Sequence, residues 1–160
     1  MIRIATPDDF KTILSFYESI GRSKQDYFDE CAARGCDILI AEEEGRPVGS
    51  AVVNWTPKYS LYQKLNIPEI QDIFVIEEAR RKGHASAMIS FFEKLAKDRK
   101  CGHAGISVAL SKEYGPAQRL YFKLGYAPDG NGVTYDRSPT EQYRSYPLDD
   151  DLCLMMVKVL

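Results

Sequence analysis

The residues from 67 to 99 constrain the fold most, because they place a strand directly before a long helix. The run 67–76 is rich in isoleucine, valine and phenylalanine, which favour β-strands. The run 85–99 repeats apolar residues at three- and four-residue spacing, and its apolar stripe comprises Ala85, Met88, Ile89, Phe92, Leu95 and Ala96. A strand that leads straight into an amphipathic helix is a β-α step, which is typical of α/β proteins.

The rest of the chain alternates short strands and helices around this step. Helices are predicted at residues 7–20, 24–34 and 116–124. Strands are predicted at residues 2–5, 37–42, 48–55, 106–110 and 152–159, with a further candidate at 133–136. The resulting order, β-α-α-β-β-β-α-β-α-β-β, predicts an α/β (α+β) fold in which helices flank a mixed sheet.

The length and composition fit one domain over residues 1–160. A chain of 160 residues that is 44% hydrophobic can bury one sizeable core and is short for two. With 21 basic and 23 acidic residues, the net charge of -2 offers no broad basic face for nucleic acid. No segment approaches the roughly 20 apolar residues of a membrane span, and the first residues do not resemble a signal peptide. We therefore expect a cytoplasmic protein with no membrane partner.

The cysteine pattern gives no sign of a metal site. Cys31, Cys36, Cys101 and Cys153 show neither C-x-x-C spacing nor paired histidines nearby. Reduced thiols with a structural role are therefore the expectation, and no metal is predicted.

The loop between the central strand and its helix carries the residues of an anion site. Backbone N–H groups at a helix N-terminus attract an anion such as a diphosphate. Gly83 permits close backbone approach, Ala85 leaves room, and three basic residues stand beside them, namely Arg80, Arg81 and Lys82. An ordinary exposed basic loop would carry the same residues, so this motif alone does not decide between the two interpretations.

A second motif, at residues 115–126, gives the first one a context. Its sequence is G-P-A-Q-R-L-Y-F-K-L-G-Y. Together the two segments resemble the GNAT N-acetyltransferase superfamily, in which a strand and R-x-x-G-x-G/A precede A-x-x-L-Y-x-K-L-G-F/Y. The resemblance implies an acetyl-CoA-dependent N-acetyltransferase that uses no metal. It also implies a mixed, mostly antiparallel central sheet that is splayed near the acyl-CoA site and flanked by about four helices.

The resemblance also implies roles for individual residues. The backbone of Phe74 and Val75 would pair with the pantetheine arm, and Tyr121 would protonate the departing CoA thiolate. Arg80 would hold the loop, while the diphosphate would bind the amides of Arg81, Lys82, Gly83, His84, Ala85 and Ser86. Two positions depart from the pattern: Tyr114 stands where many members have asparagine, and His84 fills a usually small or aliphatic position. We interpret His84 as a loop residue and not as a catalyst.

Acetyl transfer also needs a base, because an alkylamine with a pKa near 10 is only about one part in a thousand neutral at pH 7. Glu69 is the candidate, since it resembles the glutamate that some family members use at the start of this strand. In strict alternation Glu69 shares a face with Gln71, whereas Asp72 points to the other face and ranks lower. The alternatives for Glu69 are a water relay in its place, or an ordinary exposed position at a strand start.

The acceptor is weakly encoded, and we favour a small-molecule primary amine over a protein N-terminus or lysine. Candidate wall residues are the aromatics Tyr17, Tyr27, Trp55, Tyr59, Tyr143 and Tyr146, and the acidic run 149–151 could attract an amine. The competing class is a non-catalytic acyl-CoA-binding regulatory module. The apolar run 152–157 makes a homodimer a further expectation.

Overall fold

The computed structural model describes residues 1–18 and 25–160, which form two compact units. The first unit comprises Met1–Trp55 and Ile70–Leu95, and the second comprises Thr56–Glu69 and Ala96–Leu160. The expected end of the first helix, at Ile20 and Gly21, lies outside the described residues. The mixed α/β class predicted from the sequence is confirmed.

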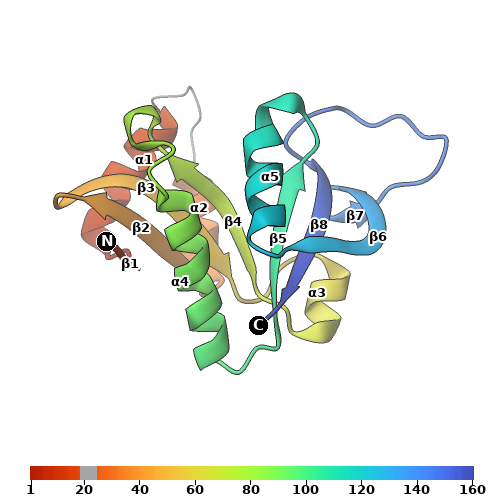
Figure 1. Cartoon of the computed structure of the whole chain (residues 1–160), viewed down its shortest axis with the longest axis horizontal. Helices are drawn as coiled ribbons and strands as arrows, with labels where there is room; N and C mark the ends of the chain where they lie inside the picture. Colours follow the sequence, from red (N-terminus) through yellow and green to blue (C-terminus); the bar gives the residue numbers. More distant parts are fainter. Residues whose placement is uncertain (19–24) are drawn as a thin grey trace. The chain divides into compact units, whose positions relative to one another are not determined.

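The first unit is built on four strands in the order β1-β2-β3-β4. β1 pairs antiparallel with β2, and β2 with β3, so the strands predicted at 37–42 and 48–55 form a hairpin, drawn in orange in Figure 1. Its turn, Glu44 and Gly45, has φ values of 52° and 78°, as a two-residue hairpin turn requires. The strands span β1 (Ile2–Ile4), β2 (Asp37–Glu43), β3 (Arg46–Asn54) and β4 (Glu69–Val75), the last entering this unit at Ile70.

Amphipathic helices close the core of the first unit. They are α1 (Phe10–Glu18), α2 (Gln25–Ala33) and α4 (His84–Asp98), together with the 3-10 turns η1 (Pro7–Asp9) and η2 (Glu77–Ala79). One buried cluster comprises Ile13, Phe16, Tyr17, Phe28, Cys31, Ile38, Ile40 and Val52. Aromatic and branched side chains from α1 and α2 thus pack on those of β2 and β3, which supplies the main stabilising force.

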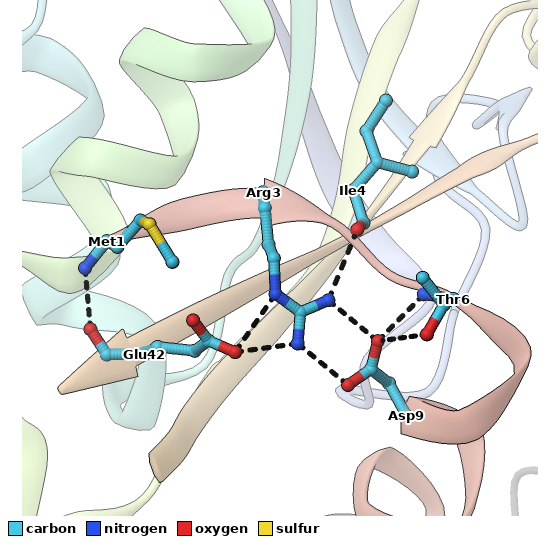
Figure 2. Close-up of polar contacts among 6 residues, drawn as sticks. All are labelled: Met1, Arg3, Ile4, Thr6, Asp9 and Glu42. Atoms are coloured by element: carbon cyan, nitrogen blue, oxygen red, sulfur yellow. Dashed lines mark hydrogen bonds and ion pairs between the residues drawn. The ribbon is translucent and has the colours of Figure 1, made fainter. Parts of the chain in front are cut away.

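A polar network joins the N-terminal strand to β2. Figure 2 shows the Arg3 guanidinium between two carboxylates, at 2.7 Å from Asp9 Oδ2 and 2.6 Å from Glu42 Oε1. Asp9 also accepts the backbone N–H of Thr6 at 2.7 Å, which completes a capping box at the start of η1. The hydrogen bonds from Arg3 hold the pKa of Asp9 well below its usual range.

The second unit has four antiparallel strands in the order β5-β8-β6-β7, and β5, β8 and β6 lie side by side in Figure 1. Its strands are β5 (His103–Ala109), β6 (Ala127–Tyr135), β7 (Ser138–Pro139) and β8 (Leu152–Val159). Its helices are α3 (Ser60–Leu65), α5 (Gly115–Lys123) and the 3-10 turn η3 (Lys112–Tyr114). β8 pairs on both sides, and its Cys153, Met155 and Met156 are buried, which already explains the apolar character of these positions in the late strand.

Two elements of the second unit differ from the sequence-based expectations. α3 was not expected, and it brings the described α-helices to five where about four were predicted. Its Tyr62 is fully buried and donates a hydrogen bond to the carbonyl of Met156, while a Cβ at Gly105 would lie 2.5 Å from the Tyr62 ring. Distant contacts, and not a helical pattern, therefore fix this segment. β6 is also longer than the predicted 133–136, with a register shift between Pro128 and Val133.

Within the described part of the chain, no helix combines the length and the apolar character that a membrane span would need.

Candidate active site

The exit of β4 is held tightly against β3. A Cβ at Gly49 would lie 2.5 Å from the Phe74 carbonyl oxygen, so only glycine permits this approach. The N–H of Ile76 donates to the carbonyl of Val48 at 3.0 Å. From the far side of the loop, Arg80 Nε donates to the Val75 carbonyl at 3.0 Å. The end of the strand and the loop after it are thus fixed by backbone and guanidinium contacts.

The loop then turns into α4 through two left-handed residues. Arg81 has a φ of 61° and Gly83 a φ of 91°, and a Cβ at Gly83 would meet no atom within 4 Å. The first intrahelical bond runs from the N–H of Ala87 to the carbonyl of Gly83 at 2.9 Å. The three preceding amides, of His84, Ala85 and Ser86, therefore have no intrahelical acceptor. Open space beside Gly83 and this amide cluster form a site suited to an anion.

The acidic side chain of Glu43 lies beside the basic loop. Lys82 Nζ lies 3.0 Å from both carboxylate oxygens of Glu43, and His84 Nε2 lies 3.9 Å from Glu43 Oε2. The hydrogen bond from Lys82 lowers the pKa of Glu43. An exposed ion pair of this kind stabilises the protein little. Lys82 can therefore leave Glu43 and bind an anionic ligand at a small cost in free energy.

The side chains of the two strand residues assigned to the pantetheine arm are anchored in the first unit. The Phe74 ring stacks on Phe16 with centroids 5.8 Å apart and lies 5.3 Å from the Tyr17 ring. Val75 Cγ2 approaches the position of a Gly49 Cβ at 3.3 Å. Any ligand contact along this strand end therefore falls mainly to its backbone.

Asp72 is a polar centre whose contacts strict alternation along β4 did not predict. Its φ of 47° breaks the extended geometry on which strict alternation along β4 depends. Its carboxylate accepts a short hydrogen bond from the Tyr27 hydroxyl, and its carbonyl accepts one from the Tyr17 hydroxyl at 3.1 Å. Burial and the Asp72 charge raise the pKa of Tyr27. The available signal was the aspartate itself, which tolerates left-handed backbone better than the β-branched residues around it.

Glu69, the predicted base, lies in the second unit and is fully buried, with 0% of its surface exposed. An exposed position, one alternative left by the sequence, is therefore wrong. Arg137 Nη2 lies 3.1 Å from Glu69 Oε1 and 3.4 Å from Ser107 Oγ. Arg137 sits in the β6–β7 turn with a φ of 60°. Sequence reasoning missed it, because no local pattern links two residues that far apart.

Tyr121, the predicted acid, also lies in the second unit, on α5, and is buried. Burial raises the pKa of Tyr121, and the neighbouring Tyr114 raises it further. The phenol therefore keeps its proton throughout the neutral range. Gln118 Nε2 donates to the Ala109 carbonyl at 2.9 Å and ties this helix to β5.

The six aromatic candidates for the acceptor site divide between the two units. Tyr17 and Tyr27 converge on Asp72 in the first unit, where Trp55 Nε1 donates to Asp37 at 2.8 Å. In the second unit Tyr59 is a core residue that donates to Asp129 at 2.6 Å. Tyr143 is 104% exposed and Tyr146 accepts the N–H of Glu141.

The acidic run is partly engaged by tyrosines. Asp149 accepts the Tyr135 hydroxyl at 2.8 Å, and Asp150 accepts the Tyr114 hydroxyl at 2.7 Å. These contacts fix the run on the surface of the second unit. Across the described ranges 1–18 and 25–160, no group of three or more histidine, cysteine or acidic side chains is arranged to hold a metal ion.

Comparison with protein families gives one match. The model of the acetyltransferase (GNAT) family matches residues 8–126, which include the loop and both motifs. Among curated proteins, none matches the sequence.

Solved structures share the fold over the whole chain. Ribosomal-protein-alanine N-acetyltransferase from Brucella melitensis is 17% identical, with a TM-score of 0.71 and coverage of 100% of this chain and 99% of that one. Ard1 from Thermoplasma volcanium is 18% identical, with a TM-score of 0.73 and coverage of 100% and 97%. A GNAT family acetyltransferase from Elizabethkingia anophelis, solved with acetyl-CoA bound, is 15% identical, with a TM-score of 0.67 and coverage of 100% and 97%. At these identities the similarity establishes the fold alone.

Proposed function

Because the chain belongs to the acetyltransferase (GNAT) family, we propose that it transfers the acetyl group of acetyl-CoA to the primary amine of a small molecule. The proposal depends chiefly on one observation. The loop after β4 is held by the hydrogen bond from Arg80 to the Val75 carbonyl. It ends at the three N-terminal amides of α4, next to the open space beside Gly83. That arrangement suits the diphosphate of coenzyme A.

The cofactor would lie along the end of β4 and over this loop. Its diphosphate would accept N–H bonds from residues Arg81 to Ser86, and its pantetheine arm would pair with the backbone of Phe74 and Val75. The small Ala85 and the Cβ-free Gly83 support close approach of phosphate oxygens to the backbone. Lys82 would exchange Glu43 for a phosphate oxygen, which adds a charge-assisted contact.

The chemistry would be direct attack of the acceptor nitrogen on the thioester carbon. The nitrogen lone pair forms the new C–N bond in a tetrahedral intermediate, and the C–S bond then breaks with its electrons going to sulfur. The Tyr121 hydroxyl would donate a proton to the departing thiolate. The buried phenol holds its proton at neutral pH, as a proton donor must, while its raised pKa makes it a weaker acid than an exposed tyrosine.

The proton lost by the amine would pass to Glu69, directly or through water. Arg137 holds the Glu69 carboxylate in one orientation by its 3.1 Å contact, which supports a positioned acceptor of that proton. A small amine acceptor fits the carboxylate of Asp72, whose negative charge attracts an ammonium group. Transfer to a protein N-terminus, and acyl-CoA binding without turnover, are the competing outcomes of the experiments below.

Calorimetry with acetyl-CoA tests the cofactor site. Gly83→Val should weaken binding at least about tenfold, because a β-branched residue both strains a left-handed position and fills the open space. Gly130→Val is the matched control: Gly130 also has a positive φ, 86°, and a Cβ added there would likewise meet no atom within 4 Å. Equal affinity of the two variants and the parent would exclude the proposed diphosphate site.

A screen of thiol release from acetyl-CoA tests turnover and acceptor class. Polyamines, aminoglycosides, amino acids and N-terminal peptides would be compared at equal concentration. Fastest release with a small amine supports the proposal, and fastest release with peptides contradicts it. Tight acetyl-CoA binding without release for any acceptor would instead favour the non-catalytic module.

A further inference from the structure

The C-terminal end of α2 brings two cysteines together. The N–H of Cys36 donates to the carbonyl of Cys31 at 2.9 Å, and the N–H of Gly35 donates to the carbonyl of Ala32 at 3.1 Å. Gly35 has a φ of 71°. This pair of hydrogen bonds with a left-handed glycine is a Schellman motif, which places the side chains of its first and last residues in contact. Here those side chains are the thiols of Cys31 and Cys36.

The two thiols differ in their surroundings. Cys31 is buried in the core of the first unit, whereas Cys36 packs against that core and is only partly covered. The two are hydrogen-bonded to each other, and this bond lowers the pKa of Cys36 to about 7, although burial opposes the shift. The charge of Arg34 lowers the pKa further, and that of Asp37 raises it. Cys36 is thus a partly exposed thiol with thiolate character, beside a second thiol.

The other cysteines lack this combination. Cys153 is buried, its sulfur donates to the Asp150 carbonyl at 3.1 Å, and burial raises its pKa to about 11. Cys101 is partly covered and lies in the turn after α4. Reactivity toward oxidants follows thiolate character and exposure together, and Cys36 combines both with a neighbouring thiol.

We propose that Cys31 and Cys36 form a modification site that hydroperoxides oxidise reversibly to an intramolecular disulfide. The Cys36 thiolate attacks one peroxide oxygen, the O–O bond breaks, and the departing oxygen takes a proton to leave as water or alcohol. The Cys31 sulfur then attacks the sulfenic sulfur of Cys36, the S–S bond forms, and the expelled hydroxide takes the Cys31 proton as water. Two thiols lose two electrons, and the peroxide gains them.

Peptide mapping tests this site on the full-length protein treated with hydrogen peroxide. Trypsin cleaves after Arg34, so the disulfide joins two peptides that reduction separates again. The expected result is that joined pair, with Cys36 oxidised at least about tenfold faster than Cys101. Oxidation of Cys101 at the same rate as Cys36, or a Cys36 product that is only sulfinic acid or an intermolecular dimer, would overturn the proposal.

Glycine variants test whether the Schellman motif creates the site. Gly35→Ala strains the left-handed position and should slow disulfide closure several-fold while leaving the sulfenic acid detectable. Gly45→Ala carries the same strain at a φ of 78°, in the β2–β3 turn away from the thiols, and should close at the parent rate. Equal slowing in both variants would show that the motif does not set the reaction.

Discussion

At the scale of single residues, the two proposed catalytic groups differ in their surroundings. Tyr121 is a buried phenol with a raised pKa, so it holds its proton at neutral pH. Glu69 is a buried carboxylate that Arg137 contacts at 3.1 Å. The first environment suits a proton donor, and the second holds a carboxylate in one orientation, as a positioned proton acceptor requires.

Tyr121→Phe should lower kcat about tenfold or more with little change in acetyl-CoA affinity, because it removes the proton donor for the thiolate. The effect is limited because a thiolate leaves readily without help. Because the pKa of Tyr121 is raised, its proton is retained as the pH rises, so the parent should keep its rate up to about pH 9. Steady-state kinetics from about pH 6 to pH 10 measures both effects. Tyr135→Phe, which loses only a surface hydrogen bond to Asp149, is the control.

Arg137→Met should destabilise the protein strongly, by about 3 to 5 kcal/mol, because it removes the guanidinium that pairs with a fully buried carboxylate. Urea denaturation measures the loss. Arg144→Met breaks an ion pair of similar length, 3.0 Å, between Arg144 and Glu141. Both of these side chains are about 70% exposed, so the free energy of unfolding should change by less than about 1 kcal/mol. Similar losses of stability in the two variants would show that the buried Glu69–Arg137 pair stabilises the protein no more than an exposed ion pair does.

At the scale of elements, local patterns predicted those parts whose stability is local. The β2–β3 hairpin, α4, α5 and β8 each carry a turn signal or a clear periodicity, and each lies within a few residues of its predicted range. The sequence did not predict α3, whose burial depends on contacts from Tyr62 to β5 and β8. The pairing of Arg137 with Glu69 was missed for the same reason, because it joins groups distant in sequence, which the periodicity of residues does not report.

The Arg3 network predicts how the attachment of β1 depends on pH. The folded-state pKa of Asp9 is lowered, so the stabilisation from the Arg3–Asp9 pair is complete above the unfolded-state pKa, about 4. It is then lost as the pH falls through the lower folded-state value. The parent should therefore lose melting temperature more steeply below about pH 4 than Arg3→Met does. Calorimetric scans from pH 7 to acid, compared between the two proteins, measure this, and parallel curves would contradict it.

At the scale of the whole molecule, the question is whether the two compact units unfold as one domain, as the length and composition predicted. Their boundaries fall inside regular elements, between Glu69 and Ile70 in β4 and between Leu95 and Ala96 in α4. A unit that unfolded alone would have to unravel a strand and a helix that continue into the other. Because a helix forms cooperatively along its length and small proteins unfold in an all-or-none manner, we predict a single transition.

Two probes, one in each unit, can test this cooperativity. The only tryptophan, Trp55, belongs to the first unit, where its indole N–H donates to Asp37. The buried thiol of Cys153 belongs to the second, and it can be followed with a thiol reagent once Cys31, Cys36 and Cys101 are replaced by serine. Tryptophan fluorescence and Cys153 reactivity should change at the same urea concentration in this variant, since both report one equilibrium. Separate midpoints would show two units that unfold independently, and the continuity of β4 and α4 would then not couple them.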